Sequence, residues 1–113
     1  MAKDVFAVDH ADRRRDVVMP YAPALLVRRG SLVFLSGVTA APVSTLEAAG
    51  CSLRDVVSAT RYLTDVHDQD DLNRVWAADL GDHLPTTATV EVSRLATHAR
   101  CKLEISAIAV ADT

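Results

Sequence analysis

The sequence predicts a single α+β domain in which one mixed β-sheet carries two helices on one face. Three observations support this fold class. Segments 87–95 and 101–110 alternate apolar and polar residues as strands do, segment 68–83 places apolar residues at helical spacing, and the predicted elements follow the order ββ(β)αβαββ. The length of 113 residues fits one domain, 1–113, with no internal repeat.

The N-terminal part is predicted to be mostly extended. Residues 6–8 form a short edge strand, and the charged stretch 10–20 forms a loop. Segments 24–27 and 32–36 are expected to pair as a hairpin, because Gly30 between them can supply the positive φ of a tight turn.

The middle of the chain is predicted to alternate helix and strand. A helix of about two turns at 43–50 ends at Gly50, and a single capped turn follows at 52–55. Segment 56–64 is a β-branched strand. Segment 68–83 is the strongest helix, with one apolar face made of Leu72, Val75, Trp76 and Leu80.

The last two strands carry apolar residues toward both faces of the sheet. These residues are Val90, Val92, Leu95, Leu103, Ile105, Ile108 and Val110. Helices on one side leave a second apolar face, which needs another subunit to cover it. The sequence therefore predicts an obligate oligomer.

Composition limits the classes of partner. A net charge of −3 and a pI near 5.7 argue against nucleic-acid binding, and acids flank the one basic run at 13–15. No apolar run is long enough to cross a bilayer, and no leader precedes the domain. Cys51 and Cys101 are interpreted as reduced packing residues, so a soluble, cytoplasmic protein without membrane contact is expected.

One acid, Glu104, lies within a largely apolar strand. Desolvating a carboxylate without partners costs several kcal/mol, so packing alone rarely explains such a residue. Catalysis and a structural hydrogen-bond hub remain equally open. The four histidines share no spacing typical of a metal site, so no metal is expected.

These segments resemble the reactive intermediate deaminase family, also called Rid or YjgF-like and formerly the L-PSP endoribonucleases. The matching stretches are PYAPALLV, LVFLSG, LEAAGCSLRDVV, YLTDVHDQDDLNRVWAADLGDHLPTTATVEVSRL and KLEISAIAV. The resemblance implies a chorismate-mutase-like fold and a homotrimer with a central barrel. It also implies three sites in the clefts between subunits.

The resemblance further implies hydrolysis of a small enamine or imine to a carbonyl compound, such as a keto acid, and ammonia. No cofactor is implied. Glu104 matches the acid that positions the attacking water. The implied substrate-binding residues are Tyr21, Ser36, Gly37, Asn73, Trp76, Thr87 and Thr89. For Trp76, a place on the core face of the helix is the competing interpretation.

Thr87 departs from the family, which commonly has an arginine there that binds the substrate carboxylate. The departure leaves three readings open. They are weak activity on imino acids, a substrate without a carboxylate, and an anion anchor recruited from Arg61, Arg94 or Arg100. A non-catalytic, ligand-binding or regulatory member is therefore the first alternative, and an endoribonuclease is the second.

The chain is also shorter than the family pattern. Roughly 20 residues of loop and helix are expected between about 42 and 45 but do not occur there. Either the chain has lost this segment or the sequence omits a mobile region, and omission is the favoured interpretation. The two-turn helix that remains is expected to leave the sheet under-covered.

Overall fold

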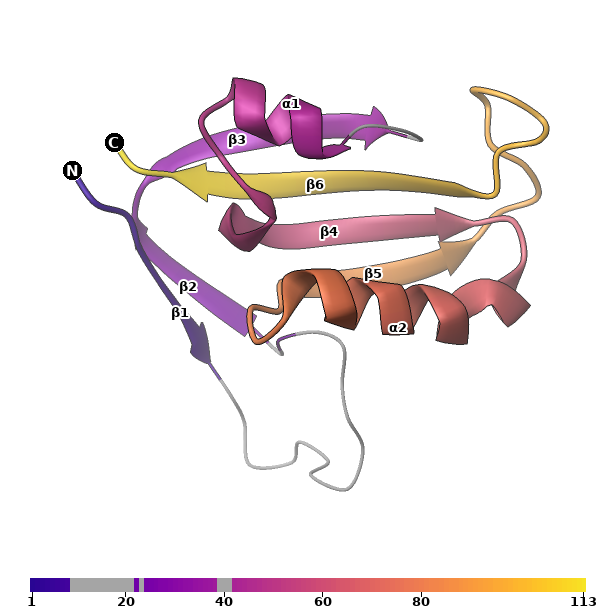
Figure 1. Ribbon diagram of the computed structural model, residues 1–113, viewed down its shortest axis with the longest axis horizontal. Helices are drawn as coiled ribbons and strands as arrows, with labels where there is room; N and C mark the ends of the chain where they lie inside the picture. Colours follow the sequence, from indigo (N-terminus) through magenta and orange to yellow (C-terminus); the bar gives the residue numbers. More distant parts are fainter. Residues whose placement is uncertain (9–21, 23, 39–41) are drawn as a thin grey trace.

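The structure is a computed structural model that describes residues 1–8, 22, 24–38 and 42–113. Four strands form the main sheet and two helices lie against it (Figure 1). A two-stranded ribbon stands beside the sheet. The elements are β1 (Asp4–Val8), β2 (Ala24–Arg29), β3 (Ser31–Val38), α1 (Pro42–Ala48), β4 (Val56–Leu63), α2 (Gln69–Leu80), β5 (Thr86–Glu91) and β6 (Leu103–Ala111), with 3₁₀ turns η1 (Leu53–Asp55) and η2 (Val66–Asp68).

The main sheet is mixed, as the sequence predicts. Its strand order is β3-β6-β4-β5, in which β4 and β5 are parallel and the other two pairs are antiparallel. Helix α2 is the crossover between the two parallel strands, a connection that antiparallel neighbours do not need. Both helices contribute to a cavity over the same face of β6, so they cover one side of the sheet.

The predicted hairpin of segments 24–27 and 32–36 is wrong. Strand β2 pairs with β1 in the ribbon, whereas β3 pairs with β6 in the main sheet. Gly30 does adopt a positive φ, of 142°, but it redirects the chain between two sheets. A Cβ at Gly30 would lie 2.2 Å from Cγ1 of Val110, so the backbone passes too close to β6 for any side chain.

Helix α2 begins and ends where its sequence provides signals. Asp70 and Asp71 lie in its first turn, where carboxylates stabilise the positive end of the helix dipole. Gly81 follows with φ of 62° and donates its N–H to the carbonyl of Ala77. The helix therefore ends at Leu80, whereas the sequence predicts that it continues to His83.

The register places alternate residues of β4 and β6 on opposite faces of the sheet. Arg61 is paired with Ile105, which lines the cavity under the helices, and Tyr62 is paired with Glu104 on the other face. The face without helices also carries exposed apolar side chains. Phe34 is 71% exposed, and Leu32 and Val90 are 56% and 43% exposed.

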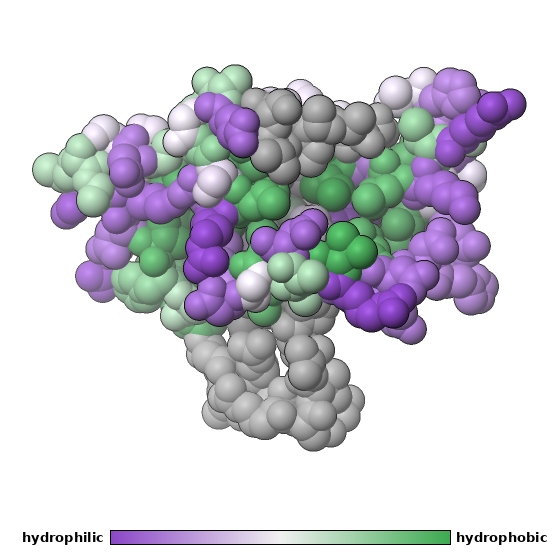
Figure 2. Space-filling model, viewed as in Figure 1, coloured by the Kyte–Doolittle hydropathy of each residue, from purple (hydrophilic) through white to green (hydrophobic). Residues whose placement is uncertain are grey.

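The helix-bearing face is only partly covered. Leu46 of α1 is 1% exposed and packs in a core cluster with residues of β3, β4 and β6. Between α1 and α2 lies a cavity of about 200 Å³ with mostly aliphatic walls. Hydrophobic residues are visible in the middle of this face in Figure 2. This opening agrees with the expectation that a two-turn helix covers the sheet poorly.

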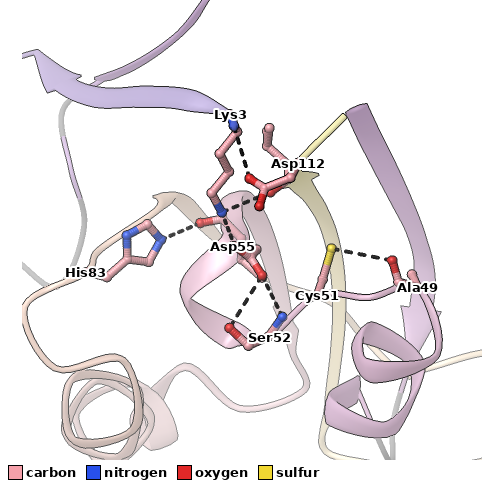
Figure 3. A network of polar contacts seen from close by, with 9 residues as sticks. Lys3, Ala49, Cys51, Ser52, Asp55, His83 and Asp112 are labelled. Atoms are coloured by element: carbon pink, nitrogen blue, oxygen red, sulfur yellow. Dashed lines mark hydrogen bonds and ion pairs between the residues drawn. The ribbon is translucent and has the colours of Figure 1, made fainter. Parts of the chain in front are cut away.

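The chain ends are tied to the main sheet by Lys3 (Figure 3). Its ammonium contacts the carboxylate of Asp55 and donates to the carbonyl of Val110, and its backbone N–H donates to Asp112 at 3.0 Å. Asp55 also accepts the N–H of Ser52 at 2.7 Å, and this hydrogen bond closes the turn η1. The capped turn that the sequence predicts at 52–55 is therefore present. Within the described residues, no helix combines the length and apolar character required to cross a membrane.

Candidate functional site

Glu104 lies directly over Gly37. A Cβ at Gly37 would be 2.7 Å from Oε2 and 2.8 Å from the carboxyl carbon of Glu104, closer than real Cβ contacts. Glycine is therefore the residue that leaves space for this carboxylate. Glu104 is half-buried, and the hydroxyl of Thr97 donates a long hydrogen bond of 3.4 Å to its Oε1.

The backbone around Gly37 is irregular at the same place. Pairing between β3 and β6 is regular from Ser31 to Leu35 and then shifts before Val38 pairs with Ile105. Such a shift leaves residues outside the ladder and redirects them. Ser36 and Gly37 fall in this interval, and both are exposed. The structure thus brings Gly37 and Glu104 together on the face without helices, and Ser36 precedes Gly37 in the same irregular interval.

A second group of predicted residues gathers around Arg61. Nε and Nη2 of Arg61 donate to Oγ1 of Thr89 at 3.0 and 2.7 Å, and Nη2 donates to Oδ1 of Asn73 at 2.7 Å. The guanidinium carbon lies 5.1 Å from the centre of the Trp76 ring, within the range of a cation–π contact. Asn73, Trp76 and Thr89 therefore converge on one buried arginine.

Thr87 lies on the same face of β5 as Thr89, because the two are separated by one residue of the strand. Its hydroxyl donates to the carbonyl of Pro85 at 3.2 Å. The hydroxyl of Thr86 likewise donates to Val57 of the neighbouring strand, at 3.0 Å. Both hydroxyls therefore donate to backbone carbonyls, and neither threonine carries the positive charge that would hold an anion.

The two groups lie on opposite faces of the sheet within one chain. Glu104 pairs with Tyr62, whereas Arg61 is the next residue and points to the helices. A site that uses residues from both groups therefore needs two faces or edges brought together by another copy. Tyr21 lies outside the described residues, so its predicted role has no structural counterpart here.

Two residues with contacts in these groups were not among the predicted site residues. Arg61 was considered only as an alternative anion anchor, although the alternation of Val57, Ala59 and Leu63 in β4 places it on the buried face. Glu104 was selected because it is a charged residue within a largely apolar strand. Arg61 is also a charged residue on the apolar face of its strand, so the same criterion would have selected it. Thr97 lies in the polar link before β6, and nothing in the sequence signals its contact with Glu104.

Other features of the described residues do not add ligands to the site. A cavity of about 380 Å³ lies between the β1–β2 ribbon and the region of η1, and none of the described site residues lines it. In the part of the chain that the structure describes, no three His, Cys, Asp or Glu residues gather as a metal site. Arg94 and Arg100 are exposed, whereas Arg61 is buried.

Comparison with known proteins identifies relatives along most of the chain. A RutC family protein of Pyrococcus abyssi is 32% identical over 117 residues, which cover 84% of this chain and 88% of the relative. A RutC family protein of Pyrococcus horikoshii is 50% identical over 50 residues. That alignment covers 44% of this chain and 40% of the relative, so it spans less than half of that protein.

TdcF of Escherichia coli, whose name classes it with the reactive intermediate deaminases, is 39% identical over 66 residues. That alignment covers 56% of this chain and 50% of TdcF. The solved structure of TdcF with bound serine superimposes with a TM-score of 0.61 and 30% identity, covering 83% of this chain and 90% of TdcF.

A family model described as Endoribonuclease L-PSP matches residues 42–111, from the start of α1 to the end of β6. This match spans more than half of the chain, and it includes the strands that carry Arg61, Thr87 and Glu104. The α+β fold agrees with that of solved members. The chain therefore belongs to the Endoribonuclease L-PSP family, the group that includes the RutC proteins and the Rid (YjgF-like) proteins.

Proposed function

We propose that the chain is an enamine/imine deaminase that hydrolyses a small reactive imine to a carbonyl compound and ammonia. The observation that carries this proposal is the placement of Glu104. Its carboxylate is half-buried, lies against a glycine backbone, and has one weak donor among the described residues, Thr97. A carboxylate with free acceptor capacity beside an open backbone can hold and deprotonate a water molecule.

The chemistry requires little beyond that water and a proton path. The water oxygen attacks the imine carbon while Glu104 accepts the water proton, and the nitrogen receives a proton in turn. The resulting carbinolamine loses ammonia when its C–N bond breaks, its hydroxyl gives up a proton, and the carbonyl forms. Holding the water in line is the main task, because the imine carbon is already electrophilic.

We further infer that the working unit is a homotrimer in the cytoplasm. Phe34, Leu32 and Val90 leave an apolar surface on the face without helices, and a second copy would bury it. An assembly would also bring the Glu104 group of one chain near surfaces of the next. Two free cysteines suit a reducing compartment.

The test measures how quickly an imine disappears. One imine is generated in situ by an amino-acid oxidase and carries a carboxylate, and a second is generated by an amine oxidase and carries none. Semicarbazide traps whatever remains. The protein should lower the trapped fraction of at least one imine, and Glu104→Gln should reduce that effect by about 100-fold or more.

Glu47→Gln is the matched control, because Glu47 is an exposed acid on α1. It should behave as the unmodified protein does. Unchanged activity in Glu104→Gln, or no effect of the protein on either imine, would overturn the proposal.

The second candidate is small-molecule binding without turnover. Thr87 favours it, because its hydroxyl is already bonded to Pro85 and offers no charge to a substrate carboxylate. Saturable binding of a small acid with no change in imine lifetime would select this function over hydrolysis.

A further inference from the structure

Arg61 is a buried cation without a counter-charge among the described residues. Its side chain lies on β4 under α2, and the residue is 2% exposed. Its hydrogen bonds go to a threonine hydroxyl and an asparagine amide, both of which are neutral. Burying an unpaired charge is costly, so charged residues in protein interiors are almost always paired.

The guanidinium also has unused donors. Of its five N–H groups, those of Nε and Nη2 are engaged, whereas Nη1 is buried and has no partner among the described residues. Desolvation lowers the pKa of Arg61, and within the described residues no anion offsets this effect. The guanidinium therefore lacks an acceptor at Nη1. A negatively charged acceptor would offset most of the desolvation cost of burying Arg61.

Trp76 supplies a second unused donor at the same place. Its ring lies against the Arg61 guanidinium, and its Nε1 is also buried, with no acceptor in the part of the chain that the structure describes. Buried polar groups are nearly always hydrogen-bonded, so two adjacent orphan donors are unusual. Both call for the same kind of partner, a group with two acceptor atoms.

The surroundings specify the rest of the ligand. Trp76 and Ile105, the register partner of Arg61, are walls of the cavity of about 200 Å³ between α1 and α2. The other walls are mainly leucine and valine side chains, and Asp79 of α2 is the one charged residue among the described residues of the lining. A ligand that reaches Arg61 from this cavity has an anionic head and a short apolar body.

We propose that Arg61 and Trp76 bind the carboxylate of a small aliphatic acid, whose hydrocarbon part lies in the adjoining cavity. A carboxylate matches the forked donors of arginine better than a single-atom anion does. The position of Arg61 would also compensate for the missing positive charge at Thr87, where the family commonly has an arginine. Thr89 lies two residues after Thr87 on the same face of β5, and Arg61 of the neighbouring strand β4 is its register partner. Arg61 would therefore supply, from β4, the positive charge that position 87 lacks.

The first experiment uses the unmodified protein. Trp76 is the single tryptophan of the chain, so its indole N–H gives one resonance in a ¹⁵N-labelled sample and its fluorescence reports on this site alone. Butyrate and butyramide, which differ mainly in charge, are titrated at constant ionic strength. Butyrate should shift the indole resonance saturably, and butyramide should not.

The second experiment uses variants. Arg61→Lys retains a charge but loses the fork, and it should weaken butyrate binding at least about tenfold. Arg29→Lys is the matched control, because Arg29 is exposed at the end of β2 in the ribbon, and it should leave binding unchanged. Trp76→Phe keeps an aromatic ring but removes the donor, and calorimetry should show weaker binding of butyrate.

Three outcomes would overturn the proposal. They are equal responses to butyrate and butyramide, no saturable response to either (which would mean that water satisfies both donors), and unchanged binding in a folded Arg61→Lys variant. If Arg61→Lys does not fold, the two probes on the unmodified protein still decide. Because the readout is equilibrium binding, this inference stands or fails separately from the deaminase proposal.

Discussion

The carboxylate of Glu104 occupies the space that a side chain at position 37 would fill. The contact joins β6 to the irregular end of β3, and its closest distance, from a Cβ at Gly37 to Oε2, is 2.7 Å. The clash involves the far end of a flexible side chain and no backbone atom. A larger residue at Gly37 can therefore be accommodated only if the carboxylate moves.

Gly37→Ala should consequently impair function more than folding. Glu104 can rotate away at little cost, so the free energy of unfolding should fall by no more than about 1 kcal/mol. Imine hydrolysis should fall by at least about tenfold, because the displaced carboxylate no longer holds water in line. Urea unfolding and the trapping assay, run on the same preparation, measure the two effects.

A double-mutant cycle shows whether the loss acts through Glu104. If it does, Gly37→Ala should cost nothing further in the Glu104→Gln background, because the two changes remove the same interaction. Additive losses in the cycle would contradict this account of Gly37.

Local signals in the sequence were sufficient for most of the elements. Asp70, Asp71 and Gly81 mark both ends of α2, and alternation identifies β5 and β6. The partner of β2 could not be predicted in this way. Gly30 has the signature of a hairpin turn, and only the close approach of Val110, eighty residues later in the chain, excludes one.

The candidate site likewise contains features that the local sequence predicts and features that depend on contacts distant in the chain. An acid in an apolar strand marks Glu104, and the same pattern in β4 marks Arg61. Their separation onto opposite faces depends on the register of β4 against β6, which sequence periodicity alone does not fix. Contacts such as Thr97 with Glu104 depend on where the link before β6 folds back.

Phe34 should be essential for assembly. It is 71% exposed on the sheet face opposite the helices, where it would lie in a subunit interface. Light scattering should give the unmodified protein three times the 12.2 kDa chain mass, and Phe34→Glu should give a smaller particle, because a carboxylate there cannot be buried unpaired.

Val75→Glu provides the comparison for Phe34. Val75 is 59% exposed, but it lies on α2 on the other side of the sheet. It should leave the particle mass unchanged. A monomeric unmodified protein, or dissociation by Val75→Glu alone, would show that the interface lies elsewhere.

His67 should titrate above the ordinary pKa of histidine. Its Nδ1 lies 2.8 Å from Oδ1 of Asp65, and this hydrogen bond is the main cause that raises the pKa of His67. The same pair lowers the pKa of Asp65, mainly through the backbone N–H of His67. The contribution of His67 to stability is therefore fully present below the ordinary value of 6.5 and is lost as pH rises through its raised pKa.

An NMR titration of the His67 ring measures this effect. Asp65→Asn should bring the midpoint down toward 6.5, whereas Asp68→Asn should lower it much less, because Asp68 raises the pKa of His67 less than Asp65 or Glu91 does. Equal midpoints in the unmodified protein and Asp65→Asn would contradict the contact. Asp65 and His67 are both exposed, so their contact contributes little and global stability should change little when Asp65 is replaced.

Gly30→Ala should be the most damaging of the glycine substitutions. Its φ of 142° is unfavourable for any residue with a Cβ, and the new atom would meet Val110 Cγ1 at 2.2 Å and the carbonyl oxygen of Ala111 at 3.1 Å. Backbone strain and overpacking each cost about 1–3 kcal/mol, so the free energy of unfolding should fall by about 3 kcal/mol or more.

Gly50→Ala separates the two causes, because Gly50 also has a positive φ, of 77°, but has no atom within 4 Å of the new Cβ. It should cost about 1 kcal/mol in urea unfolding at the same protein concentration, from strain alone. If the two variants lose equal stability, the close approach of β6 to Gly30 contributes nothing to the loss, which would contradict this account of Gly30.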